Sequence, residues 1–249
     1  DIIEVHNRPN YVELLKDSNS KIVLYFHNDP LSMIGSKSFK ERLELLNTCS
    51  KIIFNSEWSK KRFLTKLKNI YHKSLKLEII HQSINKKNID IKKKKKLIAF
   101  VGKLNNAKGY DLFGKAITRI LNKYPDWKSV VIGDEPREKL IFKHKNLKIL
   151  GFLEHTKVLD FFKKASIAVA CSRWEEPFGR TGLEASSRGC AVIISNKGGL
   201  PESITNGIII RKLTIDNVYK SIEKLILDKE FRLNLQKNSL KNFYLTDKF

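Results

Sequence analysis

The feature that most constrains the fold of this chain is the alternation, through its second half, of short apolar runs with segments of helical periodicity. Most runs are too short for a helix, and most are followed by a stretch whose apolar residues recur every three or four positions. Strands that are apolar throughout are typical of a parallel sheet with helices on both faces. We therefore predict an α/β fold, with strands at 97–102, 129–133, 147–151, 166–172, 190–195 and 207–210, and helices at 110–124, 156–165, 180–189, 214–227 and 229–243.

The first half repeats this pattern less completely. It predicts strands at 21–27, 51–56 and 77–83 and helices at 38–49 and 57–73. A polar stretch that is rich in lysine follows, and charge runs of this kind usually form solvated linkers. We therefore expect two domains, with the boundary near Asn85 to Lys95.

The net charge of +22 has two interpretations. It can indicate a polyanionic partner, namely nucleic acid or an anionic membrane. It can also follow from composition alone, because only ten of the 48 basic residues are arginine and Lys, Asn and Ile are abundant together. We favour the second interpretation and expect no nucleic-acid partner, since no recognition motif for DNA or RNA is present.

Cysteine and histidine usage argues for a reducing compartment and against a metal site. Cys49, Cys171 and Cys190 are widely spaced and odd in number, so a disulfide framework is not expected, and the last two lie in apolar runs typical of a core. No histidine pair has the spacing of zinc ligands. We find neither an apolar run long enough for a membrane helix nor a secretory signal, and therefore expect a cytoplasmic location.

Glycine and polar residues follow one predicted strand after another in the second half. Gly102 and Lys103 follow the first strand, Gly133 to Glu135 the second, and Ser172 to Gly179 the fourth. In open parallel sheets, ligands bind beyond the carboxyl ends of the strands. These positions predict a pocket large enough for a nucleotide.

Two lysines and one predicted helix start indicate that the ligand carries a diphosphate. Lys103 and Lys108 stand at the strand end and the helix entry, and a helix that begins at Gly179 presents free N–H groups to an anion. Glu176 and Glu184 beside that helix start would accept hydrogen bonds from sugar hydroxyls. The alternative is that both lysines are ordinary surface residues and both acids merely favour the helix dipole. Walker and dinucleotide glycine motifs are absent.

Two segments resemble a known family at this point. The stretch "EPFGRTGLEASSRGCAVIISNKGGLPE" is similar to the donor-site signature of the retaining GT-B glycosyltransferases of family four, including its two glutamates eight positions apart. The stretch "FVGKLNNAKGYD" resembles that family's F-V-G-R-L-x-x-x-K-G-x-D segment. The likeness covers roughly Ile98 to Glu202 and continues more weakly upstream. It implies a GT-B fold, in which two Rossmann-like domains face a cleft.

The resemblance also implies a role for each matching residue. Lys103 and Lys108 would bind the donor diphosphate, Glu184 the ribose hydroxyls, and Glu176 the donor sugar near the reacting carbon. His27 would face the donor from the first domain, and with Glu176 it forms the expected catalytic pair. The remaining donor-site positions would act mainly through their backbone; they are Gly102, Phe152, Leu153, Phe178, Gly179, Arg180 and Thr181.

The chain departs from the family in three places. Lys103 replaces the usual arginine, which keeps the charge but loses the bidentate fork. The loop "HQSIN" replaces an Asn-Gly-x-Asp pattern, and the first domain is short, so we expect an N-terminal truncation. The expected domains are a partial acceptor-side domain at 1–88, a basic linker at 89–96, a donor-binding domain at 97–230 and a C-terminal helix at 231–249.

The resemblance implies a retaining, metal-independent transfer of a sugar from a nucleotide-diphosphate sugar, without a cofactor, to a glycan or lipid-linked acceptor in cell-envelope polysaccharide synthesis. No acidic D-x-D pair is present for a metal. Two alternatives stay open: a nucleotide-sugar epimerase of related fold, and an inactive fragment that binds nucleotide sugars or polyanions.

A stripe in the predicted helix at 57–73 has two interpretations. Phe63, Leu67, Ile70 and Tyr71 lie near one side of that helix and basic residues cover the rest. Such a helix can lie on an anionic membrane, or its apolar side can pack on the sheet of the first domain. Peripheral attachment to the inner face of the membrane is thus a hypothesis of the sequence.

Overall fold

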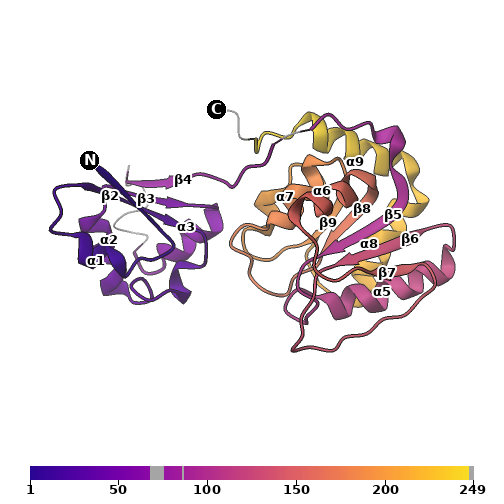
Figure 1. Ribbon diagram of the computed structural model, residues 1–249, viewed down its shortest axis with the longest axis horizontal. Helices are drawn as coiled ribbons and strands as arrows, with labels where there is room; N and C mark the ends of the chain where they lie inside the picture. Colours follow the sequence, from indigo (N-terminus) through magenta and orange to yellow (C-terminus); the bar gives the residue numbers. More distant parts are fainter. Residues whose placement is uncertain (68–75, 86, 247–249) are drawn as a thin grey trace. The chain divides into compact units, whose positions relative to one another are not determined.

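The computed structural model describes residues 1–67, 76–85 and 87–246. The chain divides into two compact units, Asp1–Gln82 and Ser83–Phe249 (Figure 1). Each is an α/β unit with an entirely parallel sheet, so the predicted fold class is confirmed. We describe the two units separately.

The first unit holds a four-stranded sheet in the order β1-β2-β3-β4. Because each strand lies beside the one before it, right-handed crossovers place the connecting helices on one face of the sheet. That face buries an apolar core centred on Leu24, Phe26, Ile52 and Phe54, none of which is exposed. The strands are β1 (Ile2–His6), β2 (Lys21–Phe26), β3 (Lys51–Phe54) and β4 (Leu77–Ile79); the helices are α1 (Tyr11–Leu15), the 3₁₀ turn η1 (Pro30–Ser32), α2 (Phe39–Thr48) and α3 (Glu57–Phe63).

Local signals explain the helix that was predicted at 38–49. Ser38 accepts a hydrogen bond from the backbone N–H of Glu41, and the Glu41 carboxylate accepts one from the backbone N–H of Ser38. This reciprocal pair is a capping box, which satisfies two free donors at the helix start. Strand β1 was not among the predicted strands, although Ile3 and Val5 are two positions apart, the period of a strand, with Glu4 between them.

The helix predicted at 57–73 is shorter in the structure. Helix α3 ends at Phe63, and Lys66 has a φ of 67°, which a right-handed helix does not accommodate. Phe63 and Leu67 are fully buried in the core of the first unit, so these two members of the apolar stripe pack on the sheet. Ile70 and Tyr71 lie outside the described residues.

The second unit holds a six-stranded sheet in the order β7-β6-β5-β8-β9-β10. Counted from β5, this is the strand order 3-2-1-4-5-6 of a Rossmann fold, in which the order reverses between the first and fourth strands. The reversal lies between β5 and β8, and the predicted strands of this half are confirmed to within two residues at each end. They are β5 (Lys95–Val101), β6 (Lys128–Ile132), β7 (Leu147–Ile149), β8 (Ala165–Ala170), β9 (Ala191–Ser195) and β10 (Ile208–Ile210).

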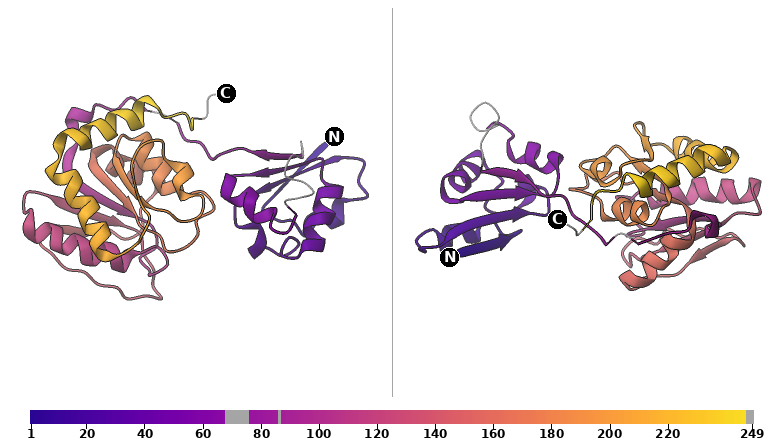
Figure 2. Two further views of the ribbon diagram at one scale, coloured as in Figure 1. Left: turned by 180° about the vertical axis from the view of Figure 1, so that it is seen from behind. Right: turned by 90° about the horizontal axis from the view of Figure 1, so that it is seen from above.

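Helices cover both faces of this second sheet (Figures 1 and 2). On one face, Phe113 of α5 and Ile222 of α8 pack against Phe100 and Val169. On the other, Phe162 of α6 and Ala185 of α7 pack against Ala99 and Ile194. The helices are α5 (Tyr110–Lys123), α6 (His155–Lys164), α7 (Arg180–Ser187), α8 (Ile215–Leu227) and α9 (Lys229–Lys241), with 3₁₀ turns η2 (Ile91–Lys93) and η3 (Leu200–Ser203).

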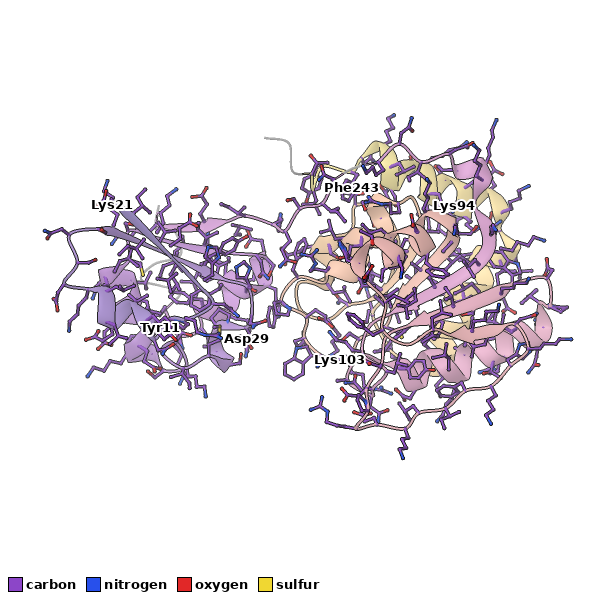
Figure 3. All side chains as sticks on the ribbon, viewed as in Figure 1. Tyr11, Lys21, Asp29, Lys94, Lys103 and Phe243 are labelled. Atoms are coloured by element: carbon purple, nitrogen blue, oxygen red, sulfur yellow. The ribbon has the colours of Figure 1, made fainter. Side chains whose placement is uncertain are left out.

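The basic stretch before β5 lies within the second unit rather than between the two units. Its Lys94 ammonium donates to the carbonyl oxygens of Phe162 at 2.9 Å and Ala165 at 2.6 Å, at the end of α6. Burial lowers the pKa of Lys94, while the nearby Cys190 thiol opposes that shift. Ile89 is also buried, so residues 89–96, which the charge run predicted as linker, are partly packed within the second unit. Lys94 and Lys103 mark the two ends of β5 in Figure 3.

Cys49, Cys171 and Cys190 are all free and buried, as the sequence indicated for the last two. Burial raises the pKa of the Cys171 thiol to about 12. No helix among the described residues is both long and apolar enough to span a bilayer.

Candidate functional site

The reversal of strand order in the second unit brings Lys108 and Glu176 together. Lys108 lies in the loop that follows β5, and Glu176 lies in the loop that follows β8. The Lys108 ammonium nitrogen is 2.5 Å from the Glu176 carboxylate, whose side chain is only 14% exposed. Both loops therefore converge beyond the carboxyl ends of the two strands, where an open α/β sheet binds its ligand.

The backbone of Glu176 is fixed by the loop after β9. The N–H of Gly199 donates to the carbonyl oxygen of Glu176 at 2.7 Å. Gly198 has a φ of 60°, and a Cβ atom there would lie 2.2 Å from that same oxygen. Gly198 thus cannot be replaced without moving Glu176, and this contact explains why the sequence has glycine at position 198.

A close approach between the two loops also requires Gly109. Its φ is 72°, and a Cβ atom would lie 1.9 Å from the carbonyl oxygen of Cys171. Ser172 reinforces this approach, because its hydroxyl donates to the carbonyl oxygen of Ala107 at 3.1 Å. Helix α5, which begins after Gly109, is therefore anchored directly to the end of β8.

Charged residues that the sequence analysis did not single out hold the loop after β5. Arg173 pairs with Asp111 through both guanidinium nitrogens, at 2.5 and 2.7 Å, and also donates to the carbonyl oxygen of Asn106. The backbone N–H of Asn106 donates to Glu138 at 2.9 Å. The aspartate of the "KGYD" segment was the available signal for this network, but its partner 62 positions away was not recognisable.

Glu135 is a second acid that the structure places beside this loop. Arg137 donates two hydrogen bonds to its carboxylate, at 2.6 and 2.9 Å, and Asn105 approaches it at 3.4 Å. The hydrogen bonds from Arg137 lower the pKa of Glu135 to about 2, and the charge of Lys103 acts in the same direction. Glu135 is therefore an anion beside this loop, and it accepts a long hydrogen bond from Asn105.

Glu184 lies inside α7 with its side chain 8% exposed. Its carboxylate is 3.0 Å from the Nε2 atom of His155, which begins α6, and 3.3 Å from the Nε atom of Arg180. His155 was absent from the predicted site. The only feature of the sequence that pointed to it was its place four residues after Gly151, where a predicted strand ends. Both nitrogens contact the same oxygen, Oε1, and a carboxylate has further lone pairs that can accept a hydrogen bond from a hydroxyl group.

The start of α7 is the predicted anion-binding element. Gly179 caps the helix with a φ of 103°, and a Cβ atom there would lie 2.3 Å from the Leu200 side chain. Arg180 and Thr181 form the first turn of the helix, whose N–H groups have no partner within the helix itself. Such N–H groups at a helix start attract phosphate.

The remaining predicted positions differ in exposure. Phe152 is 77% exposed, Leu153 packs partly against the core, and both follow Gly151 directly. Phe178 is 1% exposed and packs against Leu183 and Phe243, so its ring belongs to the core. The space beside Gly102 is open, because a Cβ atom added there would meet nothing within 4 Å. His27 belongs to the first unit and lies just after β2.

Comparisons with known proteins identify the family. The family model for glycosyl transferases group 1 matches residues 81–242. The chain is 26% identical to the putative glycosyltransferase YtcC of Bacillus subtilis over 97% of its own length and 68% of the relative. It is 29% identical to the uncharacterized glycosyltransferase MJ1607 of Methanocaldococcus jannaschii over 84% of its own length. It spans only 54% of that second relative.

The fold is similarly shared with solved structures. The structure of Anabaena Alr3699/HepE in complex with UDP-glucose superposes with a TM-score of 0.76 at 17% identity, over 97% of this chain and 73% of the other. This likeness supports the GT-B architecture that the sequence implied, with Rossmann-like units of parallel sheet. Since the family model covers well over half of its residues, the chain belongs to the glycosyl transferases group 1 family.

Proposed function

We propose that this chain transfers a sugar from a nucleotide-diphosphate sugar to an acceptor hydroxyl with retention at the anomeric carbon. The observation that carries the proposal is the contact between Lys108 and Glu176 at the reversal of strand order, beside the start of α7. A cation, a carboxylate and the N–H groups of a helix start match the three parts of such a donor: diphosphate, sugar hydroxyls and leaving oxygen.

Charge stabilisation is the main catalytic task in this proposal. Negative charge grows on the diphosphate as the bond to the sugar breaks, and preorganised cations and N–H dipoles stabilise it. Lys103, Lys108 and the N–H groups of Arg180 and Thr181 would supply that stabilisation. No metal ion is needed for this chemistry when two ammonium groups and a helix start face the leaving group.

Lys108 and Glu176 would change partners when the donor binds. In the structure the two groups neutralise one another. A diphosphate would attract Lys108 more strongly because it carries more charge than a single carboxylate. Glu176 would then be free to accept hydrogen bonds from the donor sugar, close to the reacting carbon. His27 is the second residue that we propose as catalytic.

Glu184 would recognise the ribose in this arrangement. His155 and Arg180 hold its carboxylate in place, and the remaining lone pairs can accept from the 2′ and 3′ hydroxyls. Backbone groups near Phe152 and Leu153 would face the base. A uridine nucleotide is the first donor to test, because the HepE structure of the same fold is a complex with UDP-glucose.

The acceptor in this proposal is a glycan or a lipid-linked sugar of the cell envelope, and the enzyme would act at the cytoplasmic face of a membrane. The net charge of +22 supports reversible attachment to anionic lipid. Phe63 and Leu67 of the apolar stripe are buried in the core of the first unit. These two side chains therefore cannot add apolar contacts to membrane binding.

Donor binding tests the proposal first. Calorimetry with UDP-glucose, UDP-N-acetylglucosamine and GDP-mannose should show binding of at least one, with the affinity reduced in Lys108→Ala and unchanged in Lys115→Ala. Lys115 is an exposed lysine on α5 that serves as a matched control. Absence of binding to every nucleotide sugar would contradict the proposal. Binding with conversion of the donor sugar but no transfer would indicate an epimerase instead, and binding without turnover an inactive fragment.

A further inference from the structure

Glu4, His6 and His27 form a chain of contacts at the carboxyl ends of the first two strands. Atom Nε2 of His6 lies 3.2 Å from the Glu4 carboxylate, and Nδ1 of His6 lies 3.0 Å from Nε2 of His27. The parallel register of β1 and β2 produces this alignment. Because His6 lies opposite Tyr25, the side chains of Glu4, His6, Tyr25 and His27 all project from one face of the sheet.

The two imidazole rings are arranged for a hydrogen bond rather than for stacking. Their planes differ by 14° and their centroids are 5.3 Å apart. That separation is close to the largest value that a 3.0 Å contact between the two nitrogen atoms permits, so both nitrogens lie near the line joining the ring centres. The lone pair of an imidazole nitrogen lies in the ring plane, which is the direction that this contact uses.

The surroundings hold this arrangement in place. The Asn7 side chain accepts from the backbone N–H of His27 at 3.2 Å, and buried Asn55 donates to the His27 carbonyl oxygen at 2.9 Å. Tyr25 packs on the His27 ring with a centroid distance of 4.3 Å, and its hydroxyl is fixed by the carbonyl oxygen of Ile80. The His27 ring is therefore supported by backbone, side-chain and aromatic contacts.

The Glu4 carboxylate, at one end of this series of contacts, determines which nitrogen atom carries the proton in each hydrogen bond. An ionised carboxylate only accepts, so Nε2 of His6 must carry a hydrogen. A neutral imidazole has one N–H, so Nδ1 of His6 is then an acceptor and Nε2 of His27 must donate to it. Nδ1 of His27 is left with a lone pair, and it has no hydrogen-bond partner among the described residues.

We propose that Glu4 and His6 are positioning residues that hold His27 as the tautomer with a proton on Nε2 and that leave its Nδ1 atom to accept a hydrogen bond from a substrate hydroxyl. This inference rests on the proposed function for the identity of that substrate, a sugar. Burial lowers the pKa of His27, and the charge of His6 acts in the same direction, so a neutral His27 is favoured near neutral pH.

The proton positions can be read by NMR without any assay of activity. In ¹⁵N-labelled protein at a pH of about 8, above the ordinary pKa of imidazole, a scalar coupling through the hydrogen bond should join Nδ1 of His6 to Nε2 of His27. The shared proton should be bonded to His27. Absence of the coupling, or a proton bonded to Nδ1 of His6, would overturn the proposal.

Replacing the acceptor at position 4 with a donor makes the test specific. Glu4→Lys replaces an acceptor with a donor, so Nε2 of His6 must accept, its Nδ1 must donate, and the proton of His27 must move to Nδ1. Glu13→Lys makes the same change of charge on α1 and should leave both tautomers as in the wild type. His6→Leu should abolish the coupling. His6→Asn places an acceptor oxygen near the position that Nδ1 of His6 occupies in the wild type, so the proton of His27 should stay on Nε2. A His27 tautomer that ignores Glu4→Lys would refute the role of Glu4.

Kinetics connect the positioning role to the reaction. Glu4→Lys should lower kcat at least tenfold with little change in the KM for the donor, and His6→Asn should retain more activity than His6→Leu. If the His27 tautomer reverses in Glu4→Lys but kcat does not change, the contacts set the tautomer without serving catalysis, and the positioning role is refuted. If no variant or wild type transfers sugar while the NMR results hold, the proposed function fails and the proton arrangement stands.

Discussion

The ammonium group of Lys108 lies 2.5 Å from the carboxylate of Glu176, across 68 positions of sequence. The two groups follow the strands on either side of the point where the strand order reverses. Each is therefore held by a different strand-end loop, and each presents its charge to the same place. We propose that this pair supplies the cation and the hydrogen-bond acceptor that a nucleotide-diphosphate sugar needs.

Removal of either lysine should weaken donor binding. We expect Lys108→Ala and Lys103→Ala each to reduce affinity for the donor by about 1–3 kcal/mol, the magnitude of a lost charged hydrogen bond. The effect of Lys108→Ala should be the larger, because Lys108 lies at the reversal point with its carboxylate partner. Isothermal calorimetry checks this expectation, with Lys115→Ala as the control. Equal affinity in the wild type and both variants would refute the diphosphate site.

The two glutamates should have separable effects. Glu184→Gln should mainly weaken the binding of the free nucleoside diphosphate, because its proposed contact is with the unreacting ribose. Glu176→Gln should mainly lower kcat, because its proposed contact is with the reacting sugar. Titration of UDP and steady-state kinetics on each variant distinguish the two roles. The assignment fails if UDP binds Glu184→Gln as tightly as it binds the wild type.

Glu223 should make the stability of the second unit depend on pH in the acid range. Its carboxylate accepts from Tyr219 at 2.6 Å and from Lys123 and Tyr124 at 2.9 Å, joining α5 to α8. These hydrogen bonds, led by that of Tyr219, lower the pKa of Glu223 from 4.5 to about 2. A lowered pKa contributes stability above the ordinary value, and that contribution is lost as the pH falls through the folded value.

Urea unfolding checks this dependence. The wild type should be more stable than Glu223→Gln at pH values above about 4.5, and the difference should shrink steadily as the pH falls toward 2. Glu230→Gln, an exposed position at the start of α9, is the control and should show a much smaller difference. A difference between wild type and Glu223→Gln that stays constant with pH would contradict the account.

Chelators should leave the reaction unaffected. Two lysines and a helix start are proposed to stabilise the leaving diphosphate, so kcat should be unchanged after treatment with EDTA. Turnover before and after chelation, and after addition of Mg²⁺ or Mn²⁺, measures this. Activity that disappears with EDTA and returns with a divalent ion would refute the metal-independent mechanism.

The proposed attachment to membranes would be electrostatic and weak. It predicts that the protein floats with vesicles that contain phosphatidylglycerol at low salt and is released at high salt, because screening shortens the range of the attraction. Vesicles of phosphatidylcholine alone are the control. A protein that ignores anionic vesicles at low ionic strength has a net charge of purely compositional origin.

The sheet of the second unit was predictable because its central strands β8 and β9 are buried on both faces and so are almost entirely apolar. Phe100 and Val169 belong to such runs, and the turns between them carry glycine. Strand β1 was harder to predict, because it lies at the edge of its sheet and only Ile3 and Val5 face the core. The end of α3 depended on the left-handed backbone of Lys66, for which its residue type gives no signal.

The candidate site was predictable only in part, and the reason is again physical. Lys103, Lys108, Glu176 and Glu184 stood out by their positions at predicted strand ends and helix starts. Two other partners did not stand out. The contact of His155 with Glu184 joins two helices, and the contact of His6 with His27 depends on the register of β1 and β2. Pairings between elements follow from tertiary geometry, which a single sequence does not display.

The anomeric configuration of the sugar released from the donor tests the central claim most directly. Proton NMR can follow the first minutes of turnover of an α-linked UDP sugar, with water or an added glycan as the acceptor, before mutarotation equilibrates any free sugar. We predict an α-configured product and the release of UDP, both greatly reduced in Lys108→Ala. A β-configured product would contradict retention, and the absence of UDP release with every donor and acceptor tried would contradict glycosyl transfer itself.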